Sequence, residues 1–268
     1  MARYQVILAY DGTEFAGFQR QARARTVQGE VEAALGQLGW AGRVILAAGR
    51  TDTGVHASGN VIAFDLEWRH PLEELQRAIN GLLPADIAVK SAVEADPGFH
   101  PRFDALSRIY RYQVYCRPQR DPLRERYAWR VWPGADLDRL QQAAGILTGV
   151  HDFSAFGAPP RPGSSPVRVV MRSEWSQTAG ELVYRVEANA FLYHMVRRMV
   201  FLQVQVAQGR LGIDELERGF SEGAVRIPGL APAHGLALDE VVYPPPAAWP
   251  AERHEPVSDE DHQGLMRD

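Results

Sequence analysis

The sequence predicts a protein of mixed α and β elements, either α/β or α+β, built from two halves. Apolar or alternating segments typical of strands are interleaved with segments of helical periodicity, and this pattern occurs in both parts of the chain. The 268 residues are enough to bury a full core, in two small domains or in one large one. We expect a first domain at 1–103, a second at 104–246, and a separate tail at 247–268.

The elements of the first half follow from capping and periodicity. Thr26 is a typical N-cap residue for a helix over about 26–38, and the apolar run at 43–48 is typical of a buried strand. The other elements expected in this half are strands at 3–10, 58–67 and 86–94 and a helix at 71–82.

The second half is expected to begin with an alternating strand at 106–116. Its other expected elements are helices at 136–147, 191–208 and 213–221 and strands at 166–176, 181–189 and 236–243. The prolines at 244–246 should end the folded body, because proline continues neither a helix nor a sheet. The tail at 247–268 lacks hydrophobic periodicity and is expected to be disordered.

The charge distribution leaves a nucleic-acid partner possible despite a net charge of −4. Residues 251–268 contain six acids and two bases, so this tail alone carries −4 and the rest of the chain is neutral. A neutral body can still present a basic surface. Of the 29 basic residues only Lys90 is a lysine, and arginine suits phosphate binding and base stacking.

The composition argues against several other classes of protein. Cys116 is the only cysteine, so neither an internal disulfide nor a thiolate metal site is expected. No apolar stretch is long enough to span a membrane, and the N-terminus has no signal-peptide pattern. We expect a soluble, cytoplasmic protein that needs no membrane.

The segment Gly49–Ala57, GRTDTGVHA, is the strongest candidate for a reactive site. It follows an apolar strand, and Gly49 and Gly54 bracket a turn that can present Asp52 in a cleft. The nearby Arg50 should favour the ionised carboxylate, which is the form that attacks carbon. The alternative is a glycine-rich loop in which the aspartate only hydrogen-bonds within its own turn.

Two further segments carry candidate substrate-binding residues. On the strand at 106–116, Tyr110 alternates with Arg111 and can stack on a base, although tyrosines also pack well within ordinary sheets. On the helix at 191–208, His194, Arg197, Arg198 and Gln205 form a polar arc opposite the apolar stripe, an arrangement that is also typical of a solvated face. The isolated His56 and His194 are interpreted as hydrogen-bonding residues rather than metal ligands.

The first loop is a candidate for RNA-backbone binding, because it leads into a helix N-terminus and carries several arginines. Its candidate residues are Asp11, Gly12, Phe18, Gln19, Arg20, Arg23 and Arg25. The sequence Asp11-Gly12 is equally compatible with a simple tight turn.

Four segments in a fixed order resemble one family. They are YDGT at 10–13 with FAGFQ at 15–19, GRTDTGVHA at 49–57, FHPRFDA at 99–105 with YRY at 110–112, and NAFLYHMVR at 189–197. Together these segments resemble the TruA family of tRNA pseudouridine synthases over roughly residues 3 to 243.

The resemblance implies an α+β fold of two ferredoxin-like halves, with joined antiparallel sheets and an active-site cleft between them. It implies that Asp52 is the nucleophile, that Arg197 pairs with it in a buried ion pair, and that Tyr110 contacts the substrate. Arg50 and Arg102 lie in matching segments and become substrate-binding and RNA-binding candidates respectively. The expected enzyme isomerises uridine at positions 38, 39 and 40 in the anticodon stem-loop of tRNA, acts as a homodimer, and needs no cofactor, metal or other protein partner.

Two rival functions explain part of the pattern. The triplet Asp52-Thr53-Gly54 occurs in aspartic proteases, but the charge of Arg50 would disturb a pair of carboxylates that share one proton. A non-catalytic RNA-binding protein would use Tyr110 and the arginines, but it would leave an anionic Asp52 in a phosphate-binding site without a purpose. The synthase explains all of these residues.

Overall fold

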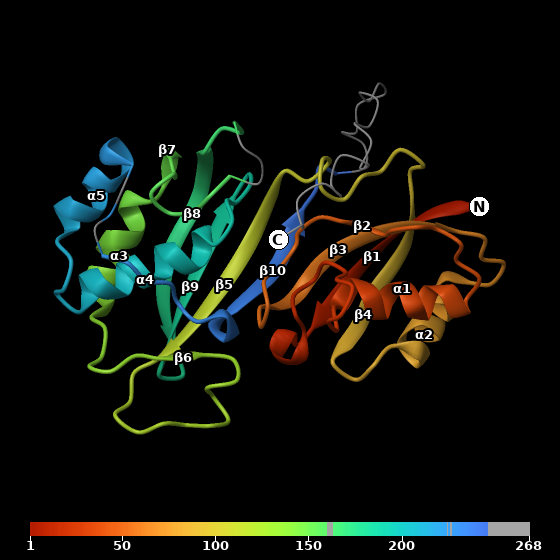
Figure 1. Cartoon of the computed structure of the whole chain (residues 1–268), viewed down its shortest axis with the longest axis horizontal. Coiled ribbons are helices and arrows are strands. Elements are labelled where there is room, and N and C mark those ends of the chain that lie inside the picture. Colours follow the sequence, from red (N-terminus) through yellow and green to blue (C-terminus); the bar gives the residue numbers. More distant parts are fainter. Residues whose placement is uncertain (160–162, 224, 226, 246–268) are drawn as a thin grey trace.

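Ten strands form a mixed sheet that runs through both halves of the computed structural model (Figure 1). The structure describes residues 1–159, 163–223, 225 and 227–245, so the predicted acidic tail lies outside the described residues. The strand order is β4-β1-β3-β10-β5-β9-β8-β7, with β2 paired to β3 and β6 paired to β5. The predicted α+β class is confirmed, because most neighbouring strands are antiparallel and the helices lie in two groups.

The first half packs two helices on one face of its strands. Its elements are β1 (Ala2–Tyr10), a 3-10 turn (Gly12–Glu14), α1 (Val27–Gln37), β2 (Leu46–Ala47), β3 (His56–Leu66), α2 (Leu72–Leu82) and β4 (Ile87–Ala95). Along β1, Tyr4, Val6 and Leu8 are buried and their neighbours are partly exposed, as expected for a sheet covered on one face. These side chains share one core cluster with apolar residues of α1 and α2.

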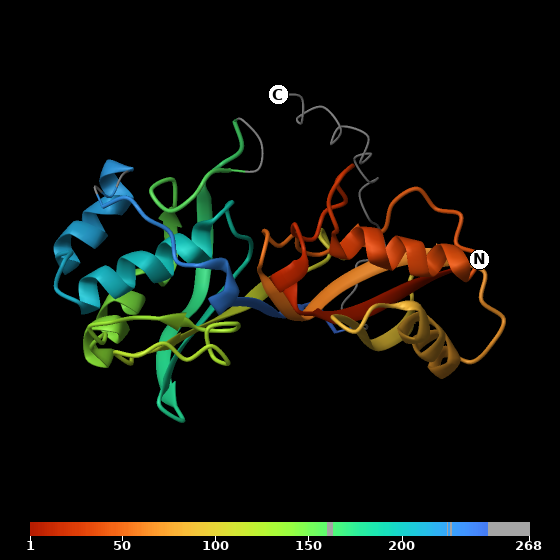
Figure 2. The ribbon, with the colours of Figure 1, turned by 60° about the horizontal axis from the view of Figure 1, so that its bottom comes forward.

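The second half repeats this arrangement with three helices. Its elements are β5 (Ser107–Tyr115), β6 (Trp129–Arg130), α3 (Leu137–Ile146), β7 (Gly149–Asp152), β8 (Val167–Thr178), β9 (Glu181–Ala188), α4 (Met195–Ala207), α5 (Ile213–Glu222), a 3-10 turn (Ala233–Gly235) and β10 (Leu236–Val242). Tyr112 and Val114 of β5 belong to a second core cluster that includes Leu140 of α3 and Met199 of α4. Figure 2 shows the two groups of helices lying apart, with β5 and β10 running between them.

The last strand of the chain joins the two halves. β10 pairs antiparallel with β5 along its length, and parallel with β3 at Ala237 and Leu238. Leu236 packs in the second core, whereas Leu238 and Val241 pack in the first. The sheets are joined as expected, but the pair of strands at the junction is parallel rather than antiparallel.

Several details differ from what was expected from sequence, including the unpredicted short strands β6 and β7. The strand predicted at 43–48 is reduced to Leu46–Ala47, and Val44 is exposed. The helix predicted from 191 begins at Met195, because His194 has a left-handed φ of 65° that interrupts helical geometry. Gln205, assigned to the polar face of this helix, is buried. None of the helices in the described ranges is long and apolar enough to cross a membrane.

Candidate active site

The Asp52 loop begins just after β2 and is fixed by hydrogen bonds from several directions. The hydroxyl groups of Tyr10 and Thr51 are 2.8 Å apart, and the Phe18 amide donates to the Thr51 carbonyl at 3.0 Å. The Val55 amide closes the turn by donating to the Asp52 carbonyl at 3.1 Å. Gly54 has a φ of 75°, so the predicted glycine turn is present at this position.

Two glycines allow the first loop to lie directly against the Asp52 loop. A Cβ atom on Gly12 would lie 2.1 Å from the carbonyl oxygen of Val55. Gly17 has a φ of 96°, and a Cβ there would lie 2.9 Å from the carbonyl oxygen of Thr51. Larger residues would therefore separate the two loops and shift the backbone that carries Asp52.

The carboxylate of Asp52 is contacted by two side chains from the second half, and both reach the same oxygen. Nη1 of Arg197 lies 3.2 Å from Oδ2 of Asp52, and Nε2 of His194 lies 3.3 Å from it. Within the ranges that the structure describes, Oδ1 of Asp52 has no hydrogen-bonding partner. One oxygen is thus held in place while the other remains available to a substrate.

This ion pair is partly accessible to solvent, whereas a buried pair was expected. The exposed fractions of the side chains are 24% for Asp52, 15% for Arg197 and 33% for His194. Arg197 is oriented by a second bond, from its Nε to the Ala231 carbonyl at 2.8 Å. The neighbouring Arg198 points elsewhere and donates to the Gly229 carbonyl. The two adjacent arginines therefore differ in role, since only Arg197 reaches the carboxylate.

Tyr110 lies on β5 with its hydroxyl directed toward the start of the Asp52 loop. A Cβ atom on Gly49 would lie 3.8 Å from that hydroxyl. Its ring packs edge-on against Phe191, with ring centroids 5.0 Å apart. Burial raises the pKa of the Tyr110 hydroxyl to about 12, although the charge of Arg108 opposes the shift. At neutral pH this hydroxyl is therefore protonated and can donate a hydrogen bond.

Arg108, two residues before Tyr110, ties together three segments around the site. Its guanidinium donates to the backbone carbonyls of Ala48, Asn189 and Arg102. Ala48 precedes the Asp52 loop, Asn189 precedes the loop that carries His194, and Arg102 precedes β5. Burial lowers the pKa of Arg108, but arginine stays charged at all ordinary pH values. Arg108 thus positions the site without touching Asp52.

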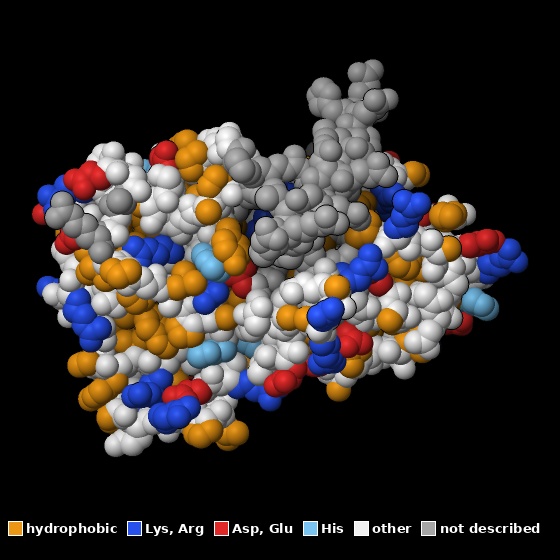
Figure 3. All heavy atoms as spheres, viewed as in Figure 1, with side chains coloured by type: hydrophobic (Ala, Val, Ile, Leu, Met, Phe, Trp, Pro, Cys, Tyr) orange, Lys and Arg blue, Asp and Glu red, His pale blue; other side chains and the backbone are white. Residues whose placement is uncertain are grey.

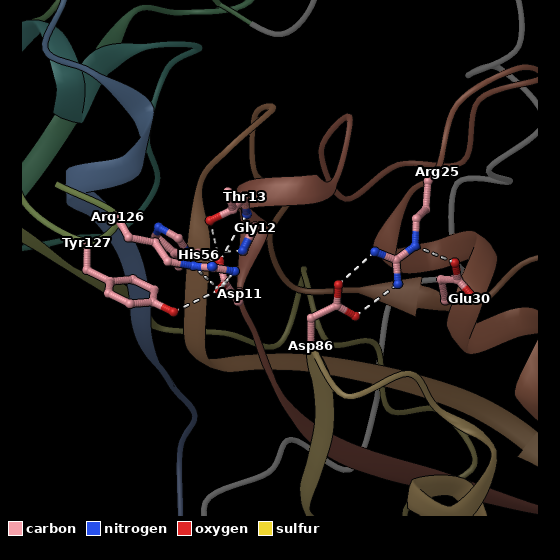
Figure 4. A network of polar contacts seen from close by, with 9 residues as sticks. All are labelled: Asp11, Gly12, Thr13, Arg25, Glu30, His56, Asp86, Arg126 and Tyr127. Atoms are coloured by element: carbon pink, nitrogen blue, oxygen red, sulfur yellow. Dashed lines mark hydrogen bonds and ion pairs between the residues drawn. The ribbon is translucent and has the colours of Figure 1, made fainter. Parts of the chain in front are cut away.

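A second carboxylate, Asp11, also joins the two halves (Figure 4). Its Oδ2 accepts from Nε of Arg126 at 2.9 Å and from the Tyr127 hydroxyl at 2.8 Å. Its Oδ1 accepts from the Thr13 hydroxyl and amide, and lies 3.1 Å from Nδ1 of His56. Burial raises the pKa of Asp11, but the hydrogen bonds from Thr13, Tyr127 and Arg126 outweigh it and hold the pKa far below its usual range.

His56 in turn connects this network to the chain just before β10. Its Nδ1 accepts from the Gly12 amide at 3.0 Å, and its Nε2 lies 3.1 Å from the His234 carbonyl. Burial lowers the pKa of His56 despite the charge of Asp11, so the ring is neutral at neutral pH. With Nδ1 accepting, the proton is assigned to Nε2, which donates to His234. His56 is a hydrogen-bonding residue here, as the sequence indicated.

The remaining predicted RNA-binding residues are spread over two groups. Gln19 and Arg23 are exposed, as is the candidate substrate-binding residue Arg50. Among the other candidates, Phe18 is buried, Arg20 pairs with Glu32, Arg25 pairs with Asp86 and Glu30, and Arg102 lies over the ring of Phe103. Figure 4 shows the Arg25 pairs beside the Asp11 network.

Sequence reasoning missed the proximity of His194 to Asp52 and the function of Arg108. His194 and Arg197 are three residues apart, a spacing that places both on one side of a helical turn, so a signal for their joint contact was present. No sequence signal identifies the partners of Arg108, because backbone carbonyls carry no residue identity. In the described part of the chain no three His, Cys, Asp or Glu side chains lie close enough to hold a metal ion.

The comparisons with known proteins agree on one activity. A family model described as tRNA pseudouridine synthase matches residues 6–104 and 143–244, which include Asp52 and Arg197 but not Tyr110. tRNA pseudouridine synthase A of Bacillus pumilus is 40% identical over 239 residues, covering 88% of this chain and 97% of that protein. The proteins of the same name from Brevibacillus brevis and Moorella thermoacetica are 40% and 41% identical, covering 91% and 89% of this chain and 100% and 98% of those proteins.

Proposed function

Since the chain belongs to the tRNA pseudouridine synthase family, and is an isomerase of tRNA uridine, we propose that its targets lie at positions 38, 39 and 40 of the anticodon stem-loop. We propose also that Asp52 is its nucleophile. Membership of an enzyme family decides against the non-catalytic RNA-binding protein and against the aspartic protease. The choice of the anticodon stem-loop rests on the resemblance of the four sequence segments.

The proposed role of Asp52 is supported by the difference in contacts between its two carboxylate oxygens. Arg197 and His194 both contact Oδ2, and Oδ1 has no partner in the described ranges. A carboxylate held in this way is ionised and oriented, and it keeps a free oxygen for attack on carbon. The carbon attacked is either the anomeric carbon of ribose or carbon 6 of uracil.

The residues around Asp52 can then be given roles in binding the substrate. The target nucleotide has to leave its stack to reach a carboxylate in a folded protein. The partly exposed ring of Tyr110 offers a surface for the extruded base, and its protonated hydroxyl can donate to a uracil oxygen. Exposed Arg50, Gln19 and Arg23 are positioned to contact the RNA backbone, and Arg102 supports this role from the loop before β5.

We propose that the functional unit is a cytoplasmic homodimer, with one tRNA lying across both subunits. Basic side chains lie on both halves of the face drawn in Figure 3, interspersed with acidic ones. A second subunit would double the available surface. Light scattering with and without tRNA checks this: the free protein should have the mass of a dimer, and a monomer active at full rate would contradict the proposal.

The substrate proposal is tested with an unmodified tRNA transcript that carries uridine at positions 38, 39 and 40. We expect pseudouridine at one or more of these positions when the product is mapped at single-nucleotide resolution. Matched transcripts in which each uridine is replaced by cytidine assign the preference. Pseudouridine confined to another arm of the tRNA would contradict the anticodon assignment without affecting the family assignment.

A further inference from the structure

We propose that His194 is a catalytic residue that removes the proton from carbon 5 of the target uracil. This inference rests on the proposed role of Asp52, because contact with that carboxylate places the imidazole at the reacting atoms. It assigns a step that neither Asp52 nor Arg197 performs.

The isomerisation requires one proton to leave carbon and another to join nitrogen. In uridine, N1 is bonded to C1′ and C5 carries hydrogen, whereas in pseudouridine C5 is bonded to C1′ and N1 carries hydrogen. The N1–C1′ bond breaks and the C5–C1′ bond forms. The bond made by Asp52 breaks as well, as C5 joins C1′ if Asp52 attacked C1′, or as the C5=C6 double bond returns if it attacked C6, and the carboxylate is regenerated. The C5–H bond then breaks, its electron pair restores the C5=C6 double bond, and N1 gains a proton, with no change of oxidation state. A base at C5 assists this step whichever carbon Asp52 attacks.

The position of His194 fits this role. Its Nε2 lies 3.3 Å from Oδ2 of Asp52, so a group bonded to the carboxylate would lie within a few ångströms of the imidazole. The ring stacks on Tyr193, with centroids 3.7 Å apart, and the side chain remains one-third exposed. His194 adopts a left-handed φ of 65° immediately before α4. Such a conformation is costly for a residue other than glycine and is often retained at functional positions.

Other groups near Asp52 are poorly suited to accept this proton. The pKa of Tyr110 is raised to about 12, so its hydroxyl is already protonated. Arg108 and Arg197 are permanently charged donors. Both nitrogens of His56 are engaged, by the Gly12 amide and by the His234 carbonyl. Asp52 is still covalently bonded at this step if it attacked carbon 6; if it attacked the anomeric carbon it is released as the C5–C1′ bond forms, and its Oδ2 remains paired with Arg197.

His194 carries the charge state that a base requires. Burial lowers the pKa of His194, and the neighbouring Arg197 lowers it further, while the carboxylate of Asp52 opposes both. Tyr193, which stacks on the ring, is the other titratable neighbour described here. The imidazole is therefore neutral at neutral pH and able to take a proton. Because this pKa is lowered, the rate of the wild-type enzyme should fall only at pH values below the ordinary histidine pKa of about 6.5.

The variant His194→Asn tests the proposal, because asparagine tolerates a left-handed backbone better than most residues. His194→Gln is the second variant, should the first fail to fold. His70→Asn is the matched control, since His70 is 64% exposed and lies beside α2. Melting temperature and tRNA affinity establish that each variant is folded and binds substrate.

The readout is the single-turnover rate on two anticodon stem-loop transcripts, one with ordinary uridine and one with deuterium at carbon 5. We expect His194→Asn to be slower than wild type on the order of a hundredfold, with a larger deuterium isotope effect and partial rescue by added imidazole. The control should show neither change, and the acidic limb of the pH profile should be lost only in the His194 variants.

Two results would overturn the proposal. The first is a folded His194→Asn that works within a few fold of wild type. The second is a slow variant whose rate is the same with both transcripts, because a residue that only positions Asp52 would not make C5 deprotonation limiting. A wild type that forms no pseudouridine in the anticodon stem-loop would instead contradict the proposed function.

Discussion

The two carboxylates Asp11 and Asp52 lie in the same half of the molecule, and each is paired with an arginine from the other half. For Asp11 both oxygens are engaged, Oδ2 by Arg126 and Tyr127 and Oδ1 by the amide and hydroxyl of Thr13. For Asp52 only Oδ2 is engaged, by Arg197 and His194. The same ion-pair chemistry therefore serves two purposes. A carboxylate with both oxygens bonded joins two surfaces, and one with a free oxygen is suited to the nucleophilic role proposed for Asp52.

The difference originates in the local backbone. Asp11 caps the 3-10 turn at Gly12–Glu14, so its first oxygen is used within its own loop before any partner from the other half arrives. Asp52 lies in a turn closed by its own carbonyl and stabilised through Thr51, and neither bond uses the carboxylate. Short-range backbone geometry thus decides which of the two acids can take part in chemistry.

The largest expected effect follows from removing the reactive carboxylate. Asp52→Asn and Asp52→Ala should abolish pseudouridine formation, because the covalent step has no other nucleophile. Affinity for tRNA should stay within a few fold, since a carboxylate contributes little to phosphate binding. Product mapping and filter binding measure the two quantities, and measurable turnover in the alanine variant would refute the assignment.

The next largest effect is expected from replacing Arg197, the arginine paired with Asp52. Arg197→Met should reduce activity on the order of a hundredfold, because Asp52 loses its orientation. The cost in stability should be about 1 to 2 kcal/mol rather than the 3 to 5 of a fully buried unpaired charge, because this pair is partly exposed.

Two matched variants test whether the loss of activity is specific to the ion pair between Arg197 and Asp52. Arg126→Met removes the partner of Asp11, and Arg198→Met removes the neighbouring guanidinium that binds the Gly229 carbonyl. Both should retain much more activity than Arg197→Met in single-turnover assays. Equal losses in all three variants would contradict the distinction between the two carboxylates.

Much of this arrangement could be predicted from the sequence, but the difference between Asp11 and Asp52 could not. Periodicity and capping located the main helices and long strands, and the motif around Asp52 identified the family. The strand predicted at 43–48 was longer than β2, and the short strands β6 and β7 were not predicted, because such short segments carry too little periodic signal. Asp11 was interpreted as an RNA-binding candidate, since the sequence does not show that Arg126 and Tyr127, more than a hundred residues away, reach its second oxygen.

Replacing Tyr110 is expected to cause an intermediate loss of activity. Two variants distinguish the contribution of the ring from that of the hydroxyl. Tyr110→Phe keeps the ring and removes a hydrogen-bond donor, so it should lose activity, and Tyr110→Ala should lose more. Because the pKa of the hydroxyl is raised to about 12, no change in wild-type rate should arise from its ionisation below pH 10. A fully active alanine variant would show that Tyr110 serves only the packing of β5.

The smallest loss of activity is expected for Asp11→Asn, which should instead lower the stability of the fold. The amide keeps one acceptor but places a donor group against Arg126 or Thr13, which should cost about 1 to 2 kcal/mol at pH 7 at this partly exposed site. The folded-state pKa of Asp11 is lowered, so its contribution to stability is complete above the unfolded pKa of about 3.9 and is lost as the pH falls toward the folded value. The difference in urea midpoint between wild type and Asp11→Asn should therefore be constant from pH 7 to 5 and shrink below pH 4. If activity is lost at pH 7 while the midpoint is unchanged, then Asp11 contacts the RNA, and filling both oxygens of a carboxylate does not exclude it from function.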